Sequence, residues 1–119
     1  MRDRSILIID DEVDFLDSVR RGLIISGYRR VTVLAQPARI RELLAEACYD
    51  IVLIDVSMPQ MSGLEVLKYI VDRCQSTVCF MLSAHDDTEI ARRCLELGAR
   101  DYLLKPISRE NLLAVLQSA

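Results

Sequence analysis

The sequence lacks several features that would place the protein in other functional classes. Of its 119 residues, only four are cysteine and one is histidine, without the C-x-x-C or Cys/His spacing of a zinc site. No apolar stretch approaches the length of a membrane span, and the run near the amino terminus is too short for a signal peptide. The net charge of −3 gives no reason to expect nucleic-acid binding. These absences favour the interpretation that residues 1–119 form a single cytoplasmic globular domain, which does not contact a membrane.

The cysteines suggest no chemistry of their own. Cys48, Cys74, Cys79 and Cys94 all lie in segments with apolar periodicity. Free cysteine behaves as a small apolar residue in such segments. We therefore expect four buried and reduced thiols.

Short apolar runs alternate with segments of helical periodicity along the whole chain. The runs predicted as buried strands are residues 5–9, 30–34, 51–54, 77–82 and 101–104. The predicted helices begin after Asp11, at Pro37, near Gly63, near Asp86 and at Ser108. There is no linker, repeat or low-complexity segment between them. The pattern predicts an α/β fold, a doubly wound five-stranded parallel sheet with helices on both faces.

The inner faces of the predicted helices follow from their spacing, as the second and third helices show. One face is predicted to carry Ile40, Leu43, Leu44 and Ala47, and the next to carry Leu64, Leu67, Ile70 and Val71. The helix that follows residues 86–88 has a narrower apolar stripe, which predicts shallower packing. At the first helix, Asp11 is a natural N-cap, so capping leaves Asp10 without an explanation.

Polar side chains directly follow four of the five predicted strands. They are Asp10 and Asp11, Asp55, Ser83 and Lys105. Right-handed crossovers place the carboxyl ends of all strands at one edge of the sheet, where ligands bind in such folds. A charge without a partner is costly inside a core, so these side chains are expected to meet at that edge.

This set of side chains has a definite chemistry. At an effective dielectric near 20, two carboxylates ~4 Å apart repel by roughly 4 kcal/mol, most of which a divalent cation would offset. Oxygen ligands without histidine or cysteine favour a hard ion, and a few carboxylates suit hydrated Mg²⁺. A metal, a hydroxyl and a lysine around one carboxylate are what phosphoryl transfer to that carboxylate needs.

With this set of side chains, the chain resembles the receiver domain of bacterial two-component response regulators. The motifs that carry the resemblance are LIIDDE at residues 7–12, IDVSMPQMSG at 54–63, SA at 83–84 and GARDYLLKP at 98–106. Each is weak alone, but their combination in this order is specific. The resemblance covers essentially all 119 residues. It implies the flavodoxin-like (βα)5 architecture of that family.

The resemblance implies a phosphoacceptor site. Asp55 matches the aspartate that accepts a phosphoryl group from a sensor histidine kinase or phosphotransfer protein. Asp10 and Asp11 match the acidic pair that holds Mg²⁺, together with Asp55 and the backbone carbonyl of Ser57. The family is a signalling module that assists its own phosphorylation and dephosphorylation rather than a dedicated enzyme.

The resemblance also implies a switch. Ser83 and Lys105 match the groups that contact the phosphoryl oxygens, and Tyr102 matches an aromatic that changes rotamer on activation. The bond before Pro106 is expected to be cis, which proline tolerates. Without a role in the switch, Ser83, Lys105 and Tyr102 would be an ordinary loop serine, surface lysine and core tyrosine. The lone His85 lies where the family varies, and we interpret it as a rim residue that tunes dephosphorylation.

The expected partners follow from the switch. The helix from Asp86 to Leu97, the strand with Tyr102 and the helix after Ser108 would form the partner-binding face. That face would control an output domain beyond residue 119 or a separate target protein, and it could support a homodimer.

Three other functions fit the residues less well. A flavodoxin-like electron carrier needs a Ser/Thr/Gly-rich phosphate loop after the first strand, where Asp10, Asp11 and Glu12 would repel phosphate. An aspartate-nucleophile phosphatase needs a carboxylate two residues after the nucleophile, where Ser57 stands. A purely structural interaction module would leave the polar strand ends unexplained.

Overall fold

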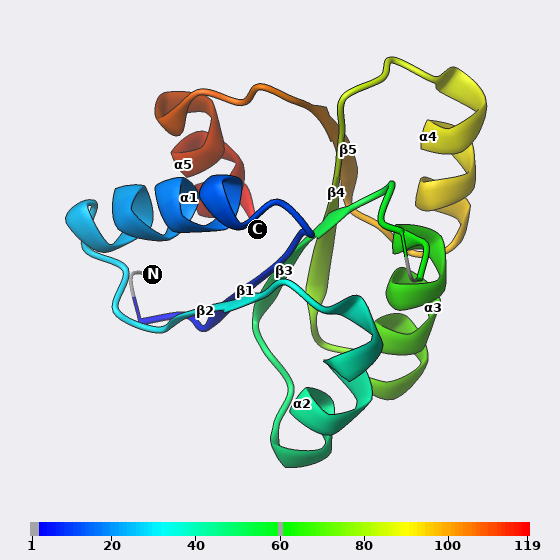
Figure 1. The fold of residues 1–119 in the computed structure, drawn as a ribbon, viewed down its shortest axis with the longest axis horizontal. Helices are drawn as coiled ribbons and strands as arrows, with labels where there is room; N and C mark the ends of the chain where they lie inside the picture. Colours follow the sequence, from blue (N-terminus) through cyan, green and yellow to red (C-terminus); the bar gives the residue numbers. More distant parts are fainter. Residues whose placement is uncertain (1–2, 60) are drawn as a thin grey trace.

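A computed structural model describes residues 3–59 and 61–119, and its centre is one parallel sheet (Figure 1). The strands are β1 (Ile6–Ile9), β2 (Val31–Leu34), β3 (Ile51–Asp55), β4 (Val78–Ser83) and β5 (Asp101–Leu104). Their order is β2-β1-β3-β4-β5, and each neighbouring pair is parallel. The predicted doubly wound α/β fold is confirmed.

Helices cover both faces of this sheet. They are α1 (Val13–Ile25), α2 (Ile40–Glu46), α3 (Gly63–Arg73), α4 (Thr88–Glu96) and α5 (Arg109–Ser118), and a 3-10 turn (Pro37–Arg39) leads into α2. Helices α1 and α5 pack on one face, and α2, α3 and α4 pack on the other (Figure 1). In the described part of the chain, no helix is both long enough and apolar enough to span a membrane.

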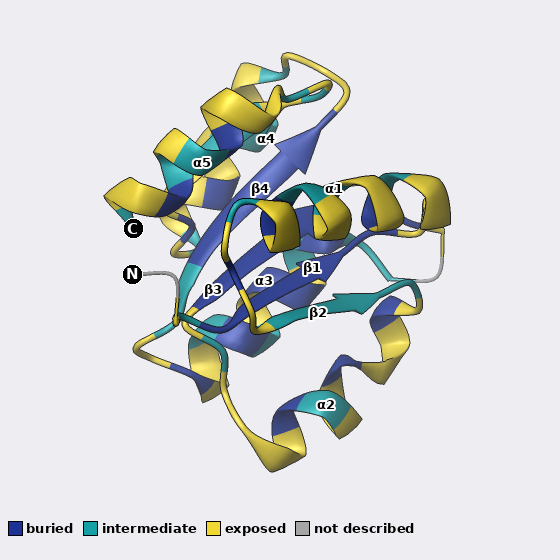
Figure 2. Cartoon of the chain, turned by 90° about the vertical axis from the view of Figure 1, so that its left-hand side faces the viewer, coloured by how far each residue is buried: buried dark blue, intermediate teal, exposed yellow. Residues whose placement is uncertain are grey.

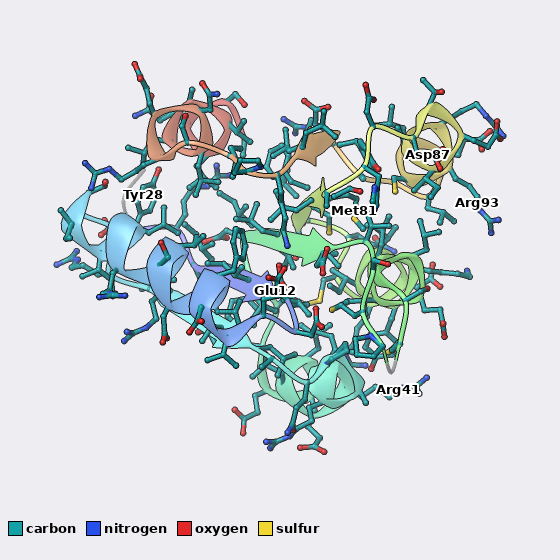
Figure 3. All side chains as sticks on the ribbon, turned by 45° about the horizontal axis from the view of Figure 1, so that its top comes forward. Glu12, Tyr28, Arg41, Met81, Asp87 and Arg93 are labelled. Atoms are coloured by element: carbon teal, nitrogen blue, oxygen red, sulfur yellow. A yellow bond between two sulfur atoms is a disulfide. The ribbon has the colours of Figure 1, made fainter. Side chains whose placement is uncertain are left out.

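The core has two halves because successive strand residues point to opposite faces. Ile8, Leu53 and Phe80 pack with α1 and α5, together with Tyr28, whereas Met81 belongs to the half under α2, α3 and α4 (Figure 3). Strands β1 and β3 are fully buried, and the edge strand β2 is only half-buried (Figure 2). The prediction that the strands are buried is therefore most accurate for the strands at the centre of the sheet.

The start of α1 differs from the prediction. Glu12, not Asp11, occupies the N-cap position, and no side chain caps the helix. The Asp10 carboxylate instead accepts a hydrogen bond from the Glu12 N–H at 3.0 Å. Asp10 is the buried member of the acidic pair, and Asp11 is exposed.

Other helix ends agree with the prediction. Asp87 accepts hydrogen bonds from the N–H groups of Glu89 and Ile90 at the start of α4. Ser108 caps α5 by accepting from Asn111 N–H at 3.1 Å. Helix α4 is loosely packed, since Cys94 is its only buried residue.

The predicted inner face of α2 is one residue too long. Ile40 and Leu44 are buried and Leu43 is half-buried, but Ala47 lies beyond the end of the helix and is exposed. Ala47 cannot reach the core because its backbone is extended.

The inner face of α3 is rotated from the predicted one. Leu67 and Ile70 are buried as expected, but Val66 is buried in place of Leu64 and Val71, which are half-buried. The sheet therefore covers a stripe that is centred slightly to one side of the apolar residues.

The prediction of four reduced thiols is wrong for two of them. Cys48 and Cys74 form a disulfide with their Cα atoms 5.8 Å apart. Cys48 is exposed in the loop after α2, and Cys74 is buried at the carboxyl end of α3. Folding brings these ends together, although they are 26 residues apart in sequence. Cys79 and Cys94 are free and buried, as predicted.

Candidate functional site

The carboxyl ends of the central strands meet at one edge of the sheet, as the topology requires. Asp55 is the last residue of β3 and Ser83 the last residue of β4, while Asp10 follows β1 directly. Asp10, Asp55 and Ser83 are 0%, 6% and 5% exposed. Together with Ser5, they are the buried polar residues among those described. Buried polar groups of this kind need partners, and those of Asp10, Asp55 and Ser83 lie around this edge.

Three carboxylates crowd this edge. Asp10, Asp11 and Asp55 each offer an oxygen, and these oxygens all lie within 4.8 Å of one another. Burial and the Asp10 charge raise the pKa of Asp55 from 3.8 to about 6, against the lowering effects of Lys105 and the Ser57 backbone. Asp11 raises it slightly further. The ionised cluster is therefore short of positive charge.

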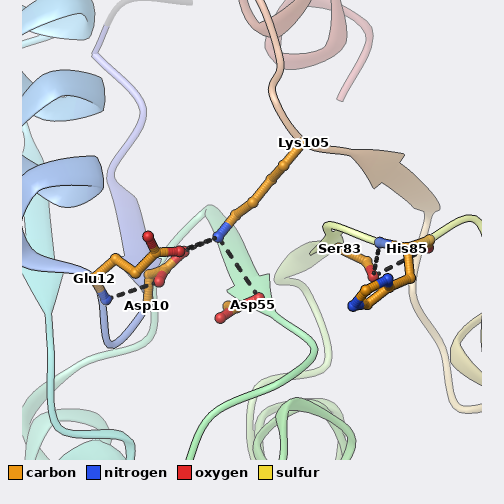
Figure 4. A network of polar contacts seen from close by, with 6 residues as sticks. All are labelled: Asp10, Glu12, Asp55, Ser83, His85 and Lys105. Atoms are coloured by element: carbon orange, nitrogen blue, oxygen red, sulfur yellow. Dashed lines mark hydrogen bonds and ion pairs between the residues drawn. The ribbon is translucent and has the colours of Figure 1, made fainter.

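Lys105 supplies part of that charge (Figure 4). Its Nζ atom lies 2.6 Å from Asp10 Oδ2, 3.5 Å from Glu12 Oε1 and 3.7 Å from Asp55 Oδ1. It also lies 4.3 Å from the centroid of the Phe15 ring. Burial alone would lower the pKa of Lys105, but the hydrogen bond and charge of Asp10, with the other two carboxylates, raise it. The amine is thus held as an ammonium ion at the carboxylates.

Ser83 lies at the same edge but is turned to another partner (Figure 4). Its Oγ accepts a hydrogen bond from His85 N–H at 3.1 Å and donates one to His85 O at 3.2 Å. The Tyr102 hydroxyl donates to the same carbonyl at 2.8 Å. The His85 backbone therefore connects Ser83 to Tyr102 on β5. Sequence reasoning missed this role, because a backbone acceptor leaves no trace in the side-chain pattern.

The loop after β3 is held close to the site. A Cβ atom on Gly63 would overlap the Asp55 carbonyl oxygen and lie 2.8 Å from Val56 Cα, so only glycine fits. The Gly63 N–H donates to Val56 O at 2.9 Å. Ser62 and Glu65 then form a capping box that starts α3. After the end of β5, the Lys105–Pro106 peptide bond is cis, as predicted.

The donor set fits a hard divalent cation. The clustered ligand atoms are all carboxylate oxygens, and two of the three residues are buried. Mg²⁺ takes oxygen ligands and keeps several of its waters, so a site with only the Asp10, Asp11 and Asp55 carboxylates suits it. The Ser57 carbonyl remains a predicted fourth ligand. Glu12 and Phe15, which flank Lys105, were not predicted as site residues, although Glu12 adjoins the acidic pair.

Comparisons with known proteins agree with this geometry. The family model described as "Response regulator receiver domain" matches residues 6–117. The chain is 35% identical over 108 residues to a cyclic di-GMP phosphodiesterase of Thermotoga maritima, covering 91% of this chain and 28% of that protein. It is 34% identical over 114 residues to the transcriptional regulatory protein KdpE of Mycobacterium tuberculosis, covering 96% and 50% respectively.

A solved structure has the same fold. A response regulator protein from Burkholderia pseudomallei, crystallised with a phosphorylated aspartic acid, calcium ion and citrate, superposes with a TM-score of 0.88 at 27% identity. The match covers 98% of this chain and 68% of that one. The chain thus spans half or less of the length of the two curated relatives named above. Because the family model covers nearly all of the sequence, the chain belongs to the family of response regulator receiver domains.

Proposed function

We propose that this domain is the phosphoacceptor of a two-component system, and that Asp55 accepts a phosphoryl group from a histidine kinase or phosphotransfer protein. The observation that carries the proposal is a buried carboxylate flanked by two others and by the Lys105 ammonium, at the ligand-binding edge of the sheet. The Burkholderia pseudomallei relative contains a phosphorylated aspartic acid. That chemistry supports the same role for the buried aspartate of this chain.

The residues have separate tasks in the transfer. An Asp55 carboxylate oxygen forms a bond to phosphorus while the bond from phosphorus to the donor imidazole nitrogen breaks, and the electron pair stays on that nitrogen. With a pKa of about 6, Asp55 is mostly ionised at neutral pH and therefore nucleophilic. Lys105, 3.7 Å from Asp55, is placed to neutralise phosphoryl oxygens.

The three carboxylates would hold Mg²⁺, with the Ser57 carbonyl as a further ligand. The ion would neutralise charge on the phosphoryl oxygens during transfer. In its absence, Lys105 is the only cationic side chain that contacts Asp10 and Asp55 among the described residues.

Phosphorylation would then switch the face formed by α4, β5 and α5. A phosphoryl group adds charge and acceptor oxygens. Ser83 would leave His85 to donate to one of these oxygens, which frees the loop at residues 84–85 and the carbonyl that Tyr102 now contacts. Helix α4 can shift because it buries only Cys94.

The proposed partners use that face. Leu95 on α4 and Leu104 on β5 are 49% and 45% exposed, which suits an interaction surface. We propose that it contacts an output domain or target protein, or a second copy of the chain, in the cytoplasm. One named relative is a transcriptional regulator and another a phosphodiesterase, so the output of this chain is not fixed by its receiver domain.

Intact mass spectrometry tests the proposal. The protein is incubated with acetyl phosphate and Mg²⁺, alone and with excess chelator. One phosphoryl mass should appear with Mg²⁺ and be strongly reduced by the chelator. The variant Asp55→Asn should remain unmodified, whereas the exposed-site control Asp72→Asn should react as wild type does. An unmodified wild-type protein that is folded and magnesium-responsive would overturn the proposed function.

A further inference from the structure

The disulfide joins two elements at the end of the sheet remote from Asp55. Cys48 lies three residues before β3, whereas Asp55 ends that strand. Cys74 caps the carboxyl end of α3, whose amino end adjoins Asp55. The bond thus closes a loop that contains β3, the phosphoacceptor and all of α3. It can respond to redox conditions without touching the acidic site.

The two cysteine residues differ in their exposure. Cys48 is exposed, and Cys74 is 4% exposed. A thiolate from solution can therefore approach the Cys48 side of the bond, with the buried Cys74 as the leaving sulfur. The free thiols of Cys79 and Cys94 do not compete, because burial raises their pKa, to about 12 for Cys79.

A hollow beside Cys48 adds a recognition element. It has a volume of about 400 Å³, and Cys48, Arg29 and Arg30 are part of its lining. These two arginines are its only charged lining residues among those described. Arg29 bonds the Asp3 carboxylate at 2.6 Å and Arg30 the Asp3 carbonyl at 3.2 Å. Each contact uses one of five guanidinium N–H groups, so donors remain for an anion.

We propose that Cys48 is a reversible thiolation site for a small thiol that carries a carboxylate, which Arg29 and Arg30 recognise. The thiolate forms a bond to Cys48 Sγ while the bond to Cys74 Sγ breaks, and the electron pair leaves with the Cys74 sulfur, which takes a proton. A second small thiolate then attacks the small-thiol sulfur of the mixed disulfide. The two small thiols leave joined as a disulfide, and the Cys48 sulfur takes a proton, so that both cysteines are thiols. The corresponding small disulfide reverses both steps.

A reversible bond at this position has a mechanical consequence. Apart from the disulfide and the apolar packing of the core, α2 contacts α3 through a hydrogen bond from Arg73 Nε to Leu44 O at 3.3 Å and through Arg41 over the Tyr69 ring at 5.0 Å. Helix α2 buries only Ile40 and Leu44. Disulfides in reducing compartments are usually transient and redox-sensing. Opening this one should loosen α2 and lower the Tm by roughly 10 °C.

Exchange rates test the recognition step. The oxidised protein is treated with thioglycolate, 2-mercaptoethanol or cysteamine, which differ in charge, and opening is followed by acid quenching, alkylation and mass spectrometry. Each rate is divided by the rate of the same thiol with the urea-unfolded protein, which removes differences in thiol reactivity. The normalised rate should be highest for thioglycolate and lowest for cysteamine, with roughly a threefold or greater difference that shrinks in high salt.

Matched variants locate the effect. The charge preference should vanish in the double variant Arg29→Gln/Arg30→Gln and persist in Arg20→Gln/Arg21→Gln, which alters arginines on α1 instead. Peptide mapping should find the first adduct on Cys48. Equal normalised rates in the wild type, a first adduct on Cys74, or the absence of a Cys48–Cys74 bond in the oxidised protein would each overturn the proposal. The wild-type comparison at low and high salt decides the outcome even if the arginine variants do not fold.

Discussion

The ammonium group of Lys105 lies 2.6 Å from the Asp10 carboxylate, which is fully buried and shares the crowded acidic edge with Asp55. This pair joins the end of β1 to the end of β5 across the sheet. Without a metal ion, Lys105 offsets only part of the repulsion among the three carboxylates. The response of the fold to added cation is therefore a direct consequence of this arrangement.

We predict that Mg²⁺ stabilises the folded domain. At ten times its dissociation constant, the ion should add about 1.4 kcal/mol to the free energy of unfolding. This corresponds to a rise in Tm of about 5 °C for a domain of this size, measured by thermal unfolding with and without the ion. Asp11→Asn should lose most of the rise, and the control Asp72→Asn should keep it. A wild-type Tm indifferent to millimolar Mg²⁺ would contradict the site.

The raised pKa of Asp55 predicts how Asp55→Asn changes stability in metal-free buffer. A carboxyl group whose pKa is raised by folding stabilises the native state below its unfolded pKa of 3.8 and loses that contribution as pH rises through about 6. Asparagine does not titrate. The variant should match wild type near pH 4 and exceed it by about 2 kcal/mol at pH 8, in urea unfolding. A variant clearly less stable at pH 8 would mean that ionised Asp55 is structurally paired.

Gly63 is predicted to be intolerant of any side chain. Gly63→Ala would place a Cβ against the backbone of Asp55 and Val56, so the loop must move and the free energy of unfolding should fall by about 1–3 kcal/mol. The control is Gly22→Ala in α1, where the new Cβ meets only the flexible Arg109 side chain at 3.4 Å. That substitution should raise helix propensity and stabilise by up to about 1 kcal/mol. Equal effects in urea unfolding would contradict the close approach at Gly63.

The hydrogen bonds of Ser83 predict its role in transmission. Ser83→Ala should still accept a phosphoryl group but respond less at α4 and β5, because no hydroxyl remains to leave His85 for the phosphoryl oxygens. The measurement is NMR of each protein with beryllofluoride, a phosphoryl mimic. Shift changes over residues 86–105 should be smaller in this variant than in wild type or in the exposed-site control Ser76→Ala. Equal changes in all three would eliminate Ser83 as the transmitter.

Much of the fold and most of the site geometry can be predicted from local sequence signals. The strands are identifiable because β1, β3 and β4 are unbroken apolar runs, and a parallel sheet brings their polar ends to one edge. The amino-acid sequence alone therefore suffices to place Asp10, Asp11, Asp55 and Lys105 together, as the structure does. Their roles in phosphoryl transfer rest on the family resemblance and stay predictions.

The errors arose where spatial contacts override local patterns. Cys48 and Cys74 are linked only because α2 and α3 lie side by side, and a separation of 26 residues carries no signal for that pairing. Asp11 is a residue type suited to capping, but Asp10 is the one that bonds the start of α1. His85 acts through its backbone carbonyl, which no side-chain pattern encodes.

Identifying the residue that carries the phosphoryl group is the most direct test of the central claim. The protein is phosphorylated with acetyl phosphate and Mg²⁺, and borohydride then reduces the acyl phosphate to an alcohol that survives peptide sequencing by mass spectrometry. The account predicts reduction at Asp55 and none at the neighbouring carboxylates of Asp10 and Asp11. Reduction at either neighbour, or at none of the three in phosphorylated protein, would contradict it.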